Sequence, residues 1–121
     1  MTWVSAGHEP ALLVDPQSGT VTDLNGDGPP LGIDPEITFH EYHVPFRDPG
    51  QVLVLYTDGI TESWNPDGKQ FGHERFKQSL LRHARQSASA ILECVIHDVF
   101  EFRSAAPQRD DLTLVVLKRS P

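Results

Sequence analysis

The chain has 121 residues, of which 38% are hydrophobic, and its formal net charge at pH 7 is −7. This length suits one domain with a moderate core, and an acidic chain without clustered Lys and Arg argues against a nucleic-acid partner. Cys94 is the only cysteine, which excludes an intrachain disulfide and a zinc site built from several thiolates. No apolar stretch reaches the length of a membrane-spanning helix, and residues 1–10 lack the pattern of a signal peptide, so we expect a cytoplasmic setting without direct membrane contact.

The first half of the chain is predicted to be rich in β-strands. Short apolar or β-branched runs bounded by Gly, Pro and Asp are the signals. We expect strands over residues 3–6, 11–14, 20–23, 37–44 and 52–56. The Gly- and Pro-rich segment 25–35 is interpreted as a surface loop.

Two helices are predicted in the second half. The first covers residues 72–84 and places Phe76, Leu80 and Ala84 on one face. The second begins after Ser87, which is expected to be its N-cap. Its expected buried stripe consists of Leu92, Val95, Val99 and Phe102. Cys94 lies in the same apolar stretch and is expected to be buried. A last strand over residues 112–117 returns the chain to the sheet.

Carboxylates stand at the ends of two of these strands. Asp58 follows the apolar run 52–56, and Asp110 and Asp111 directly precede the run 112–117. Both runs are continuous, which is typical of strands buried on both faces. Carboxylates at the ends of rigid strands can be held at a fixed separation, as a hard divalent cation requires. Asp is also common in turns and caps, so either motif taken alone is better explained as turn chemistry.

Taken together, however, the motifs resemble the PPM-type metal-dependent serine/threonine phosphatases, specifically the bacterial SpoIIE/RsbU branch. The resemblance rests on five segments that follow one another in the family's order. They are SAGHEPALLV at 5–14, GPPLGI at 28–33, LVLYTDGITES at 53–63, NPDGKQFGHERF at 65–76 and RDDLTLVVLK at 109–118. The resemblance therefore covers nearly the whole chain.

The resemblance implies an α+β fold in which a β-sandwich is flanked by helices. Members of the family also have an N-terminal half with an Asp-x-x-Gly-His-Gly-like motif, and nothing in this sequence matches it. Gly7 and His8 fit the later landmark instead. Residues 1–121 are therefore expected to form the C-terminal portion of the phosphatase domain, with a sandwich that is incomplete on its N-terminal side. Apolar surface is expected to be exposed where further strands would pack.

The resemblance also implies a two-metal site for Mn²⁺ or Mg²⁺, ions that prefer oxygen ligands. Asp58 and Asp110 are the implied ligands. Asp111 is a weaker candidate, because it could instead support the metal shell through hydrogen bonds. Gly59 is included with them because the chain must turn sharply beside a cation without a Cβ. Glu62 lies four residues after Asp58 and could lean toward the site or be a solvated acid at the start of a helix.

Two residues are weak candidates for substrate binding. His8 is the only histidine within a landmark, and its ring could contact phosphate or stabilise its own turn. Asn65 begins a loop that borders the active site in the family and could face the substrate. The remaining histidines lack the spacing of a zinc motif, and the absence of a Gly-x-Ser-x-Gly elbow argues against a serine nucleophile.

The expected activity is metal-dependent hydrolysis of phosphoserine or phosphothreonine on a bacterial signalling protein. The resemblance implies a phosphorylated anti-sigma-factor antagonist as the substrate and a sensor or receiver domain upstream. Two other interpretations stay open: a non-catalytic half-domain that binds a signalling partner, and a fragment without independent activity. Two carboxylates are few for a pair of divalent ions, so the isolated chain is expected to bind metal weakly.

Overall fold

The computed structural model describes all 121 residues, and its central element is a four-stranded antiparallel sheet. The strand order is β3-β2-β5-β6, with bounds Ala11–Asp15 for β2, Thr20–Leu24 for β3, Val52–Tyr56 for β5 and Leu114–Lys118 for β6. The β2–β3 hairpin turns where Asp15 accepts a hydrogen bond from the Gln17 N–H at 2.8 Å, and Gly19 supplies a positive φ of 69°. Strands distant in the sequence therefore become neighbours in the centre of the sheet.

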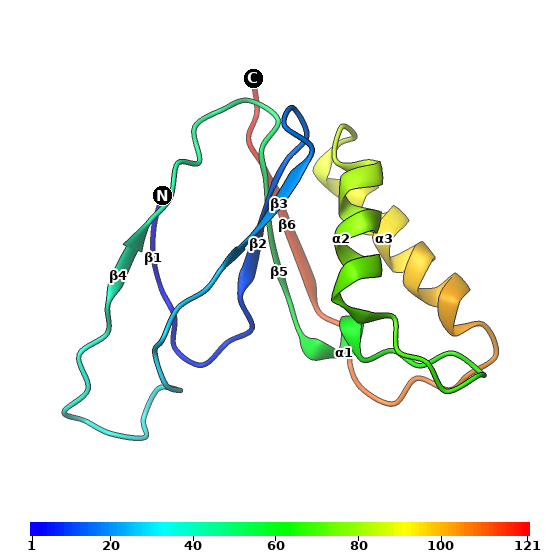
Figure 1. Ribbon diagram of the computed structural model, residues 1–121, viewed down its shortest axis with the longest axis horizontal. Helices are drawn as coiled ribbons and strands as arrows, with labels where there is room; N and C mark the ends of the chain where they lie inside the picture. Colours follow the sequence, from blue (N-terminus) through cyan, green and yellow to red (C-terminus); the bar gives the residue numbers. More distant parts are fainter.

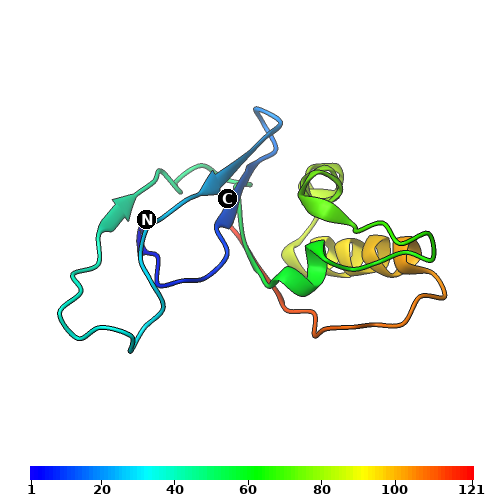
Figure 2. The ribbon, with the colours of Figure 1, turned by 60° about the horizontal axis from the view of Figure 1, so that its bottom comes forward.

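A second sheet is smaller than the sequence predicts. It pairs β1, Thr2–Val4, with β4, Glu41–His43, and the Trp3 and Tyr42 rings stack across the pair at 4.7 Å. The predicted strand over residues 37–44 was too long, because only the part opposite β1 finds a partner. Figure 2 shows this two-stranded ribbon on the opposite side of the main sheet from the helices.

Two long helices cover one face of the main sheet (Figure 1). They are α2, Gly72–His83, and α3, Ala88–Arg103. The Ser87 side chain accepts a hydrogen bond from the Ala90 N–H, which confirms the predicted N-cap. A short helix, α1, Asp58–Thr61, follows β5 directly. None of the helices is both long and apolar enough to cross a membrane.

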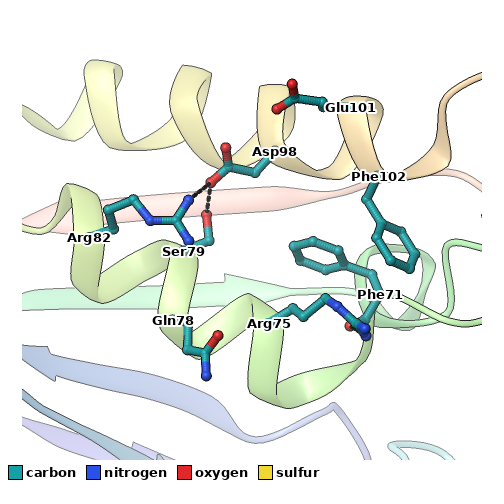
Figure 3. Close-up of a pocket in the computed structure, with 8 residues that line it drawn as sticks. All are labelled: Phe71, Arg75, Gln78, Ser79, Arg82, Asp98, Glu101 and Phe102. Atoms are coloured by element: carbon teal, nitrogen blue, oxygen red, sulfur yellow. Dashed lines mark hydrogen bonds and ion pairs between the residues drawn. The ribbon is translucent and has the colours of Figure 1, made fainter.

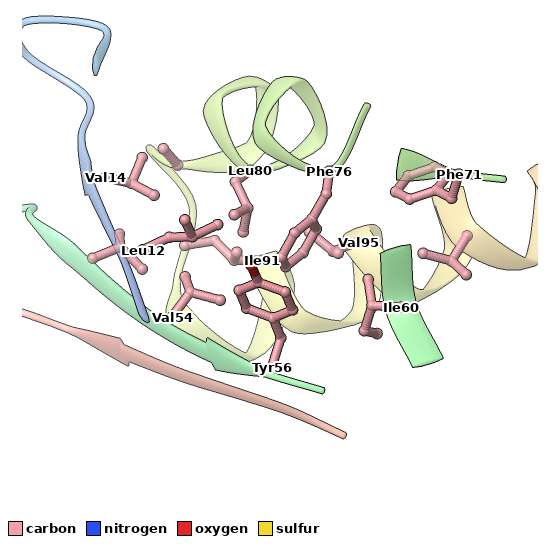
Figure 4. Packing of buried hydrophobic residues seen from close by; sticks show 13 residues of the cluster. Leu12, Val14, Val54, Tyr56, Ile60, Phe71, Phe76, Leu80, Ile91 and Val95 are labelled. Carbon is pink, nitrogen blue, oxygen red and sulfur yellow. The ribbon is translucent and has the colours of Figure 1, made fainter. Parts of the chain in front are cut away.

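The main core lies between this face and the helices (Figure 4). Its buried members are Leu12, Val14, Val52, Val54, Tyr56, Ile60, Phe71, Phe76, Leu80, Ala84, Ile91, Val95 and Val99. The predicted face of α2 is confirmed, and in α3 the predicted Val95 and Val99 are fully buried, whereas Phe102 is only half-buried. Ile91 is fully buried where the sequence pointed to Leu92, which is only half-buried, because Ile91 lies four residues before Val95 and so on the same helix face. Cys94 is also half-buried, contrary to expectation, and its thiol faces the Gln86 side chain at 3.7 Å.

The opposite face of the main sheet is only partly covered. Leu13, Leu24 and Leu53 form a small cluster there, against which Trp3 of β1 packs. At the edge of the sheet, Val115 and Leu117 of β6 are each 45% exposed. Burial on both faces is therefore confirmed for β5 but wrong for β6, because β6 is an edge strand whose outer face has no covering layer. The expected α+β class and the expected exposed apolar surface are both present.

Candidate metal and phosphate site

The register of the main sheet brings three sequence motifs to one end of it. Leu12 of β2 pairs with Val54 of β5, and Tyr56 at the end of β5 pairs with Leu114 at the start of β6. Because these pairs are antiparallel, β2 begins where β5 ends and where β6 begins. The turn 7–10, the start of α1 and the segment that carries Asp110 therefore lie at the same end, the lower one in Figure 1.

Two of these motifs touch through their backbones. A Cβ on Gly59 would overlap the carbonyl oxygen of Asp111, so only glycine allows this approach. Gly59 lies within α1 and has no positive φ, so the sequence-based reason for this glycine was incomplete. Its role is to let the backbone at Asp111 come close to α1. Asp58 directly precedes Gly59, and Asp110 directly precedes Asp111.

The two candidate carboxylates are exposed and have no cationic partner. Neither Asp58 nor Asp110 forms an ion pair, and the only internal hydrogen bond to either side chain is from the Asp111 N–H to Asp110 Oδ1 at 2.8 Å. Asp111 is also exposed. The Gly59 carbonyl accepts a hydrogen bond from the Ser63 hydroxyl at 2.8 Å, which uses part of its capacity to hold a cation. Carboxylate oxygens without competing cations are the donors that Mg²⁺ and Mn²⁺ prefer.

This donor set fits only part of the shell of a hard cation. No three His, Cys, Asp or Glu side chains in the chain are grouped so that they could hold a metal ion. Octahedral ions need six ligands, so water or groups outside this chain would have to supply most of the remainder. The arrangement can orient a cation from one side.

A small cavity of about 70 Å³ adjoins Asp110. Its lining includes Gly59 of α1 and Glu62 directly after this helix, and also Trp64, Arg103 and Arg109. Glu62 lines the same cavity as Asp110 but is exposed to water, so both interpretations of this residue stay predictions. The sequence reasoning did not identify the aromatic and basic residues of this cavity; the position of Arg109 directly before Asp110 was the available signal.

His8 and Asn65 are both engaged in their own turns. His8 Nδ1 lies 2.8 Å from the Glu9 carbonyl oxygen, and the residue lines an apolar hollow of about 140 Å³ together with Trp3 and Leu55. Asn65 Oδ1 accepts a hydrogen bond from the Lys69 N–H at 2.8 Å and closes a loop beside the Trp64–Gln70 bridge. Neither side chain lines the cavity that contains Asp110.

Tyr56 forms the buried base of this end of the sheet. Burial, with additional repulsion from the Glu9 and Asp23 charges, raises the pKa of Tyr56 to about 12. The phenol therefore stays neutral at physiological pH, with its oxygen 3.4 Å from His73 Nδ1. It packs edge-on against Phe76 at 4.8 Å and joins the end of β5 to α2.

A wider groove of about 380 Å³ lies elsewhere, between α2 and α3 (Figure 3). Asp98 has several polar contacts in this groove, and its carboxylate accepts a hydrogen bond from the buried Ser79 hydroxyl at 2.6 Å. Arg82 and His83 lie 3.4 and 3.2 Å from the same oxygen. Burial acts to raise the pKa of Asp98, but the hydrogen bonds and charges of these neighbours outweigh it and lower that pKa. This cluster fastens the two helices to each other.

Comparisons with known proteins show what the chain as a whole is similar to. The family model for stage II sporulation protein E (SpoIIE) matches residues 1–120. The chain is 28% identical to Protein IcfG of Synechocystis over 120 residues and 29% identical to the phosphoserine phosphatase RsbU of Bacillus subtilis over 119 residues. These alignments cover 99% and 98% of this chain, but 18% and 34% of the relatives. The SiaA-PP2C domain of Pseudomonas aeruginosa has a similar structure, with a TM-score of 0.78 and 28% identity over 92% of this chain and 43% of that one.

Proposed function

Because the chain belongs to the SpoIIE family of PPM-type phosphatases, we propose that it supplies Asp58 and Asp110 to a metal-dependent protein phosphatase site. The proposed substrate is phosphoserine or phosphothreonine on a bacterial signalling protein. The observation that carries the proposal is the contact between Gly59 and Asp111, which brings the segments that hold the two carboxylates together at one end of the sheet.

The chain spans only part of the length of its relatives, so the activity is proposed for the complete protein. Residues 1–121 are proposed to be the C-terminal portion of the phosphatase domain. Further carboxylates would come from outside this chain, in line with the partial donor set found here. The name of the RsbU relative, a phosphoserine phosphatase, supports the substrate class.

The chemistry assigned to this chain is the holding of cations and the orientation of the substrate. When bound, Mn²⁺ or Mg²⁺ would provide positive charge for the phosphoryl oxygens and a metal-bound water as the attacking group. Asp58 and Asp110 are both exposed to water, so a cation can approach either carboxylate from outside. Asp110 is oriented by the Asp111 N–H, and Asp111 itself is proposed to support the site through its backbone.

The proposed partners follow from the same family. A phosphorylated anti-sigma-factor antagonist is the proposed substrate protein, and an upstream sensor or receiver domain is the proposed regulator. A cytoplasmic setting belongs to this proposal. No feature of the chain suggests a nucleic-acid partner, because its net charge is −7.

The test is Mn²⁺-dependent phosphate release from a phosphoserine protein by the complete protein and its variants. We expect Asp58→Asn and Asp110→Asn each to lower the rate by at least about a hundredfold, more than the loss of a supporting residue costs. Glu93→Gln, on the exposed face of α3, is the matched control and should retain the full rate. Full activity in both site variants would remove the assignment.

A second candidate is a non-catalytic module that binds a signalling partner. It is favoured by the absence of a group of three metal-ligating side chains and by the exposed apolar face of β6. A folded complete protein that binds its partner, yet releases no phosphate with Mn²⁺ or Mg²⁺, would support this alternative.

A further inference from the structure

The cavity beside Asp110 has an ordered basic wall. The Arg109 guanidinium lies 5.4 Å from the centre of the Trp64 ring, a cation–π arrangement between two residues that line the cavity. Arg109 has no carboxylate within ion-pair distance. Its charge is therefore preorganised and not neutralised by the protein.

Arg103 strengthens the same wall from the end of α3. Its Nη1 donates a hydrogen bond to the Gln108 side chain at 3.2 Å, and Gln108 in turn donates to the Asp110 carbonyl at 2.9 Å. Arg103 Nε is the one buried side-chain nitrogen or oxygen in the chain without a hydrogen-bond partner. The same guanidinium lies 4.6 Å from the centre of the Phe100 ring, so the side chain is held in place and adds a fixed positive charge to the wall.

The charges of the residues that line the cavity indicate which chemical group would bind there. Arg103 and Arg109 line it together with Glu62 and Asp110. If Asp110 holds a cation, as proposed above, the remaining charge of the cavity is positive. An arginine that stacks on an aromatic ring and keeps free N–H groups is suited to a planar carboxylate.

We infer that this cavity is a subsite for an acidic side chain of the substrate, and that Arg109 is the specificity-determining residue. The inference rests on the proposed phosphatase function and names the substrate class more narrowly. An extended peptide advances about 3.4 Å per residue, so a side chain within two residues of the phosphoserine can reach the cavity from the carboxylates. The preferred substrate therefore carries Asp or Glu within two residues of its phosphorylated residue.

The experiment compares phosphoserine peptides that differ only in one neighbouring residue, Asp, Asn or Lys, at each position from two before to two after the phosphoserine. With the complete protein and Mn²⁺, kcat/KM for the best Asp peptide should exceed that for its Asn counterpart by about tenfold. Arg109→Glu should reverse the order, so that the Lys peptide becomes the better substrate. Each variant is judged by its own ratio between peptides, which a general loss of folding does not change.

Arg119→Glu is the matched control, because it makes the same charge change beyond the other end of β6. It should keep the preference for the Asp peptide. Equal kcat/KM for all three peptides in the unmutated protein would overturn the subsite while leaving the phosphatase function in place. If no peptide is hydrolysed, the phosphatase function fails, and binding of fluorescent forms of the same peptides decides the subsite. Tighter binding of the Asp peptide, reversed by Arg109→Glu, supports it, and equal binding overturns it.

Discussion

Thr57 and Thr113 bind each other twice where β5 ends and β6 is about to begin. The Thr57 N–H donates to the Thr113 carbonyl at 3.1 Å, and the Thr113 N–H donates to the Thr57 hydroxyl oxygen at 3.2 Å. This pair extends the β5–β6 ladder by one step, up to the residue before Asp58. It fixes the spacing of the two acidic segments independently of any metal.

Removal of the Thr57 hydroxyl should weaken Mn²⁺ binding clearly and lower the stability of the fold only modestly. Thr57→Val keeps the shape and the backbone hydrogen bond but leaves the Thr113 N–H without its acceptor, at a cost of about 0.5–1.5 kcal/mol in the free energy of unfolding. Calorimetric titration of the complete protein with Mn²⁺ should show weaker binding, and urea unfolding should show the modest loss. Thr22→Val, on the exposed face of β3, is the control. Unchanged metal affinity in Thr57→Val would contradict this role.

A methyl group at Gly59 should separate the two acidic segments. In Gly59→Ala the new Cβ meets the Asp111 carbonyl oxygen, and backbone atoms on both sides must move. Overpacking of this kind costs about 1–3 kcal/mol, and Mn²⁺ binding should fall with it. Gly68→Ala has open space but a positive φ of 76°, so it should lower stability through strain and leave metal binding intact. Equal effects of the two variants on Mn²⁺ affinity would argue against the close approach as the cause.

The cluster around Asp98 should make the α2–α3 contact sensitive to acid. Asp98→Asn removes the charge that Ser79 and Arg82 bind, and should lower the free energy of unfolding at pH 7 by about 1–3 kcal/mol. Because the folded-state pKa of Asp98 is lowered, this stabilisation is complete above the unfolded pKa of about 3.9 and is lost as the pH falls through the folded-state value. Urea unfolding of both proteins at pH 7 and pH 3 should show the difference shrinking. Glu101→Gln, 75% exposed, should change little at either pH.

The exposed face of β6 should cause self-association of the 121-residue chain. Val115 and Leu117 present apolar side chains beside an unpaired strand edge. The double variant Val115→Thr, Leu117→Thr should reduce association in sedimentation experiments and weaken the binding of a hydrophobic dye. Val116→Thr is the control, since Val116 packs toward the core and its change should instead lower stability. A monomer at all concentrations before mutation would contradict the prediction.

The helices and strands could be predicted from the sequence wherever a segment showed one clear pattern, either a continuous apolar run or apolar residues at helical spacing. The apolar run of β5 and the spacing of Phe76 and Leu80 in α2 specify their elements and buried faces. The buried stripe of α3 was ambiguous at its start. Ile91 and Leu92 are adjacent apolar residues, and helical spacing to Val95 allows either one to be buried, at four or at three residues' distance. β6 has the same composition as a strand buried on both faces, and only the sheet order shows that it lies at an edge.

The metal-site role of Asp58 and Asp110 stays a prediction, and the sequence alone did not predict where the segments that carry them lie relative to each other. Asp58 and Asp110 stood out at the ends of their strands, and the family resemblance assigned their role. The approach of their segments depends on the register between β5 and β6, which pairs residues such as Tyr56 and Leu114 across three intervening helices. The cavity wall formed by Arg103 and Arg109 depends on how the segment after α3 folds back, and local sequence signals do not specify that path.

The position of β6 in the chain order has a consequence for biosynthesis. During translation β5, α2 and α3 all emerge before the segment that carries Asp110, so the acidic end cannot assemble until β6 has paired with β5. A nascent chain that stops within α3 would have most of the residues of the core and only one of the two carboxylates. Within this segment, the order of synthesis therefore makes Asp110 the later of the two carboxylates to reach its place.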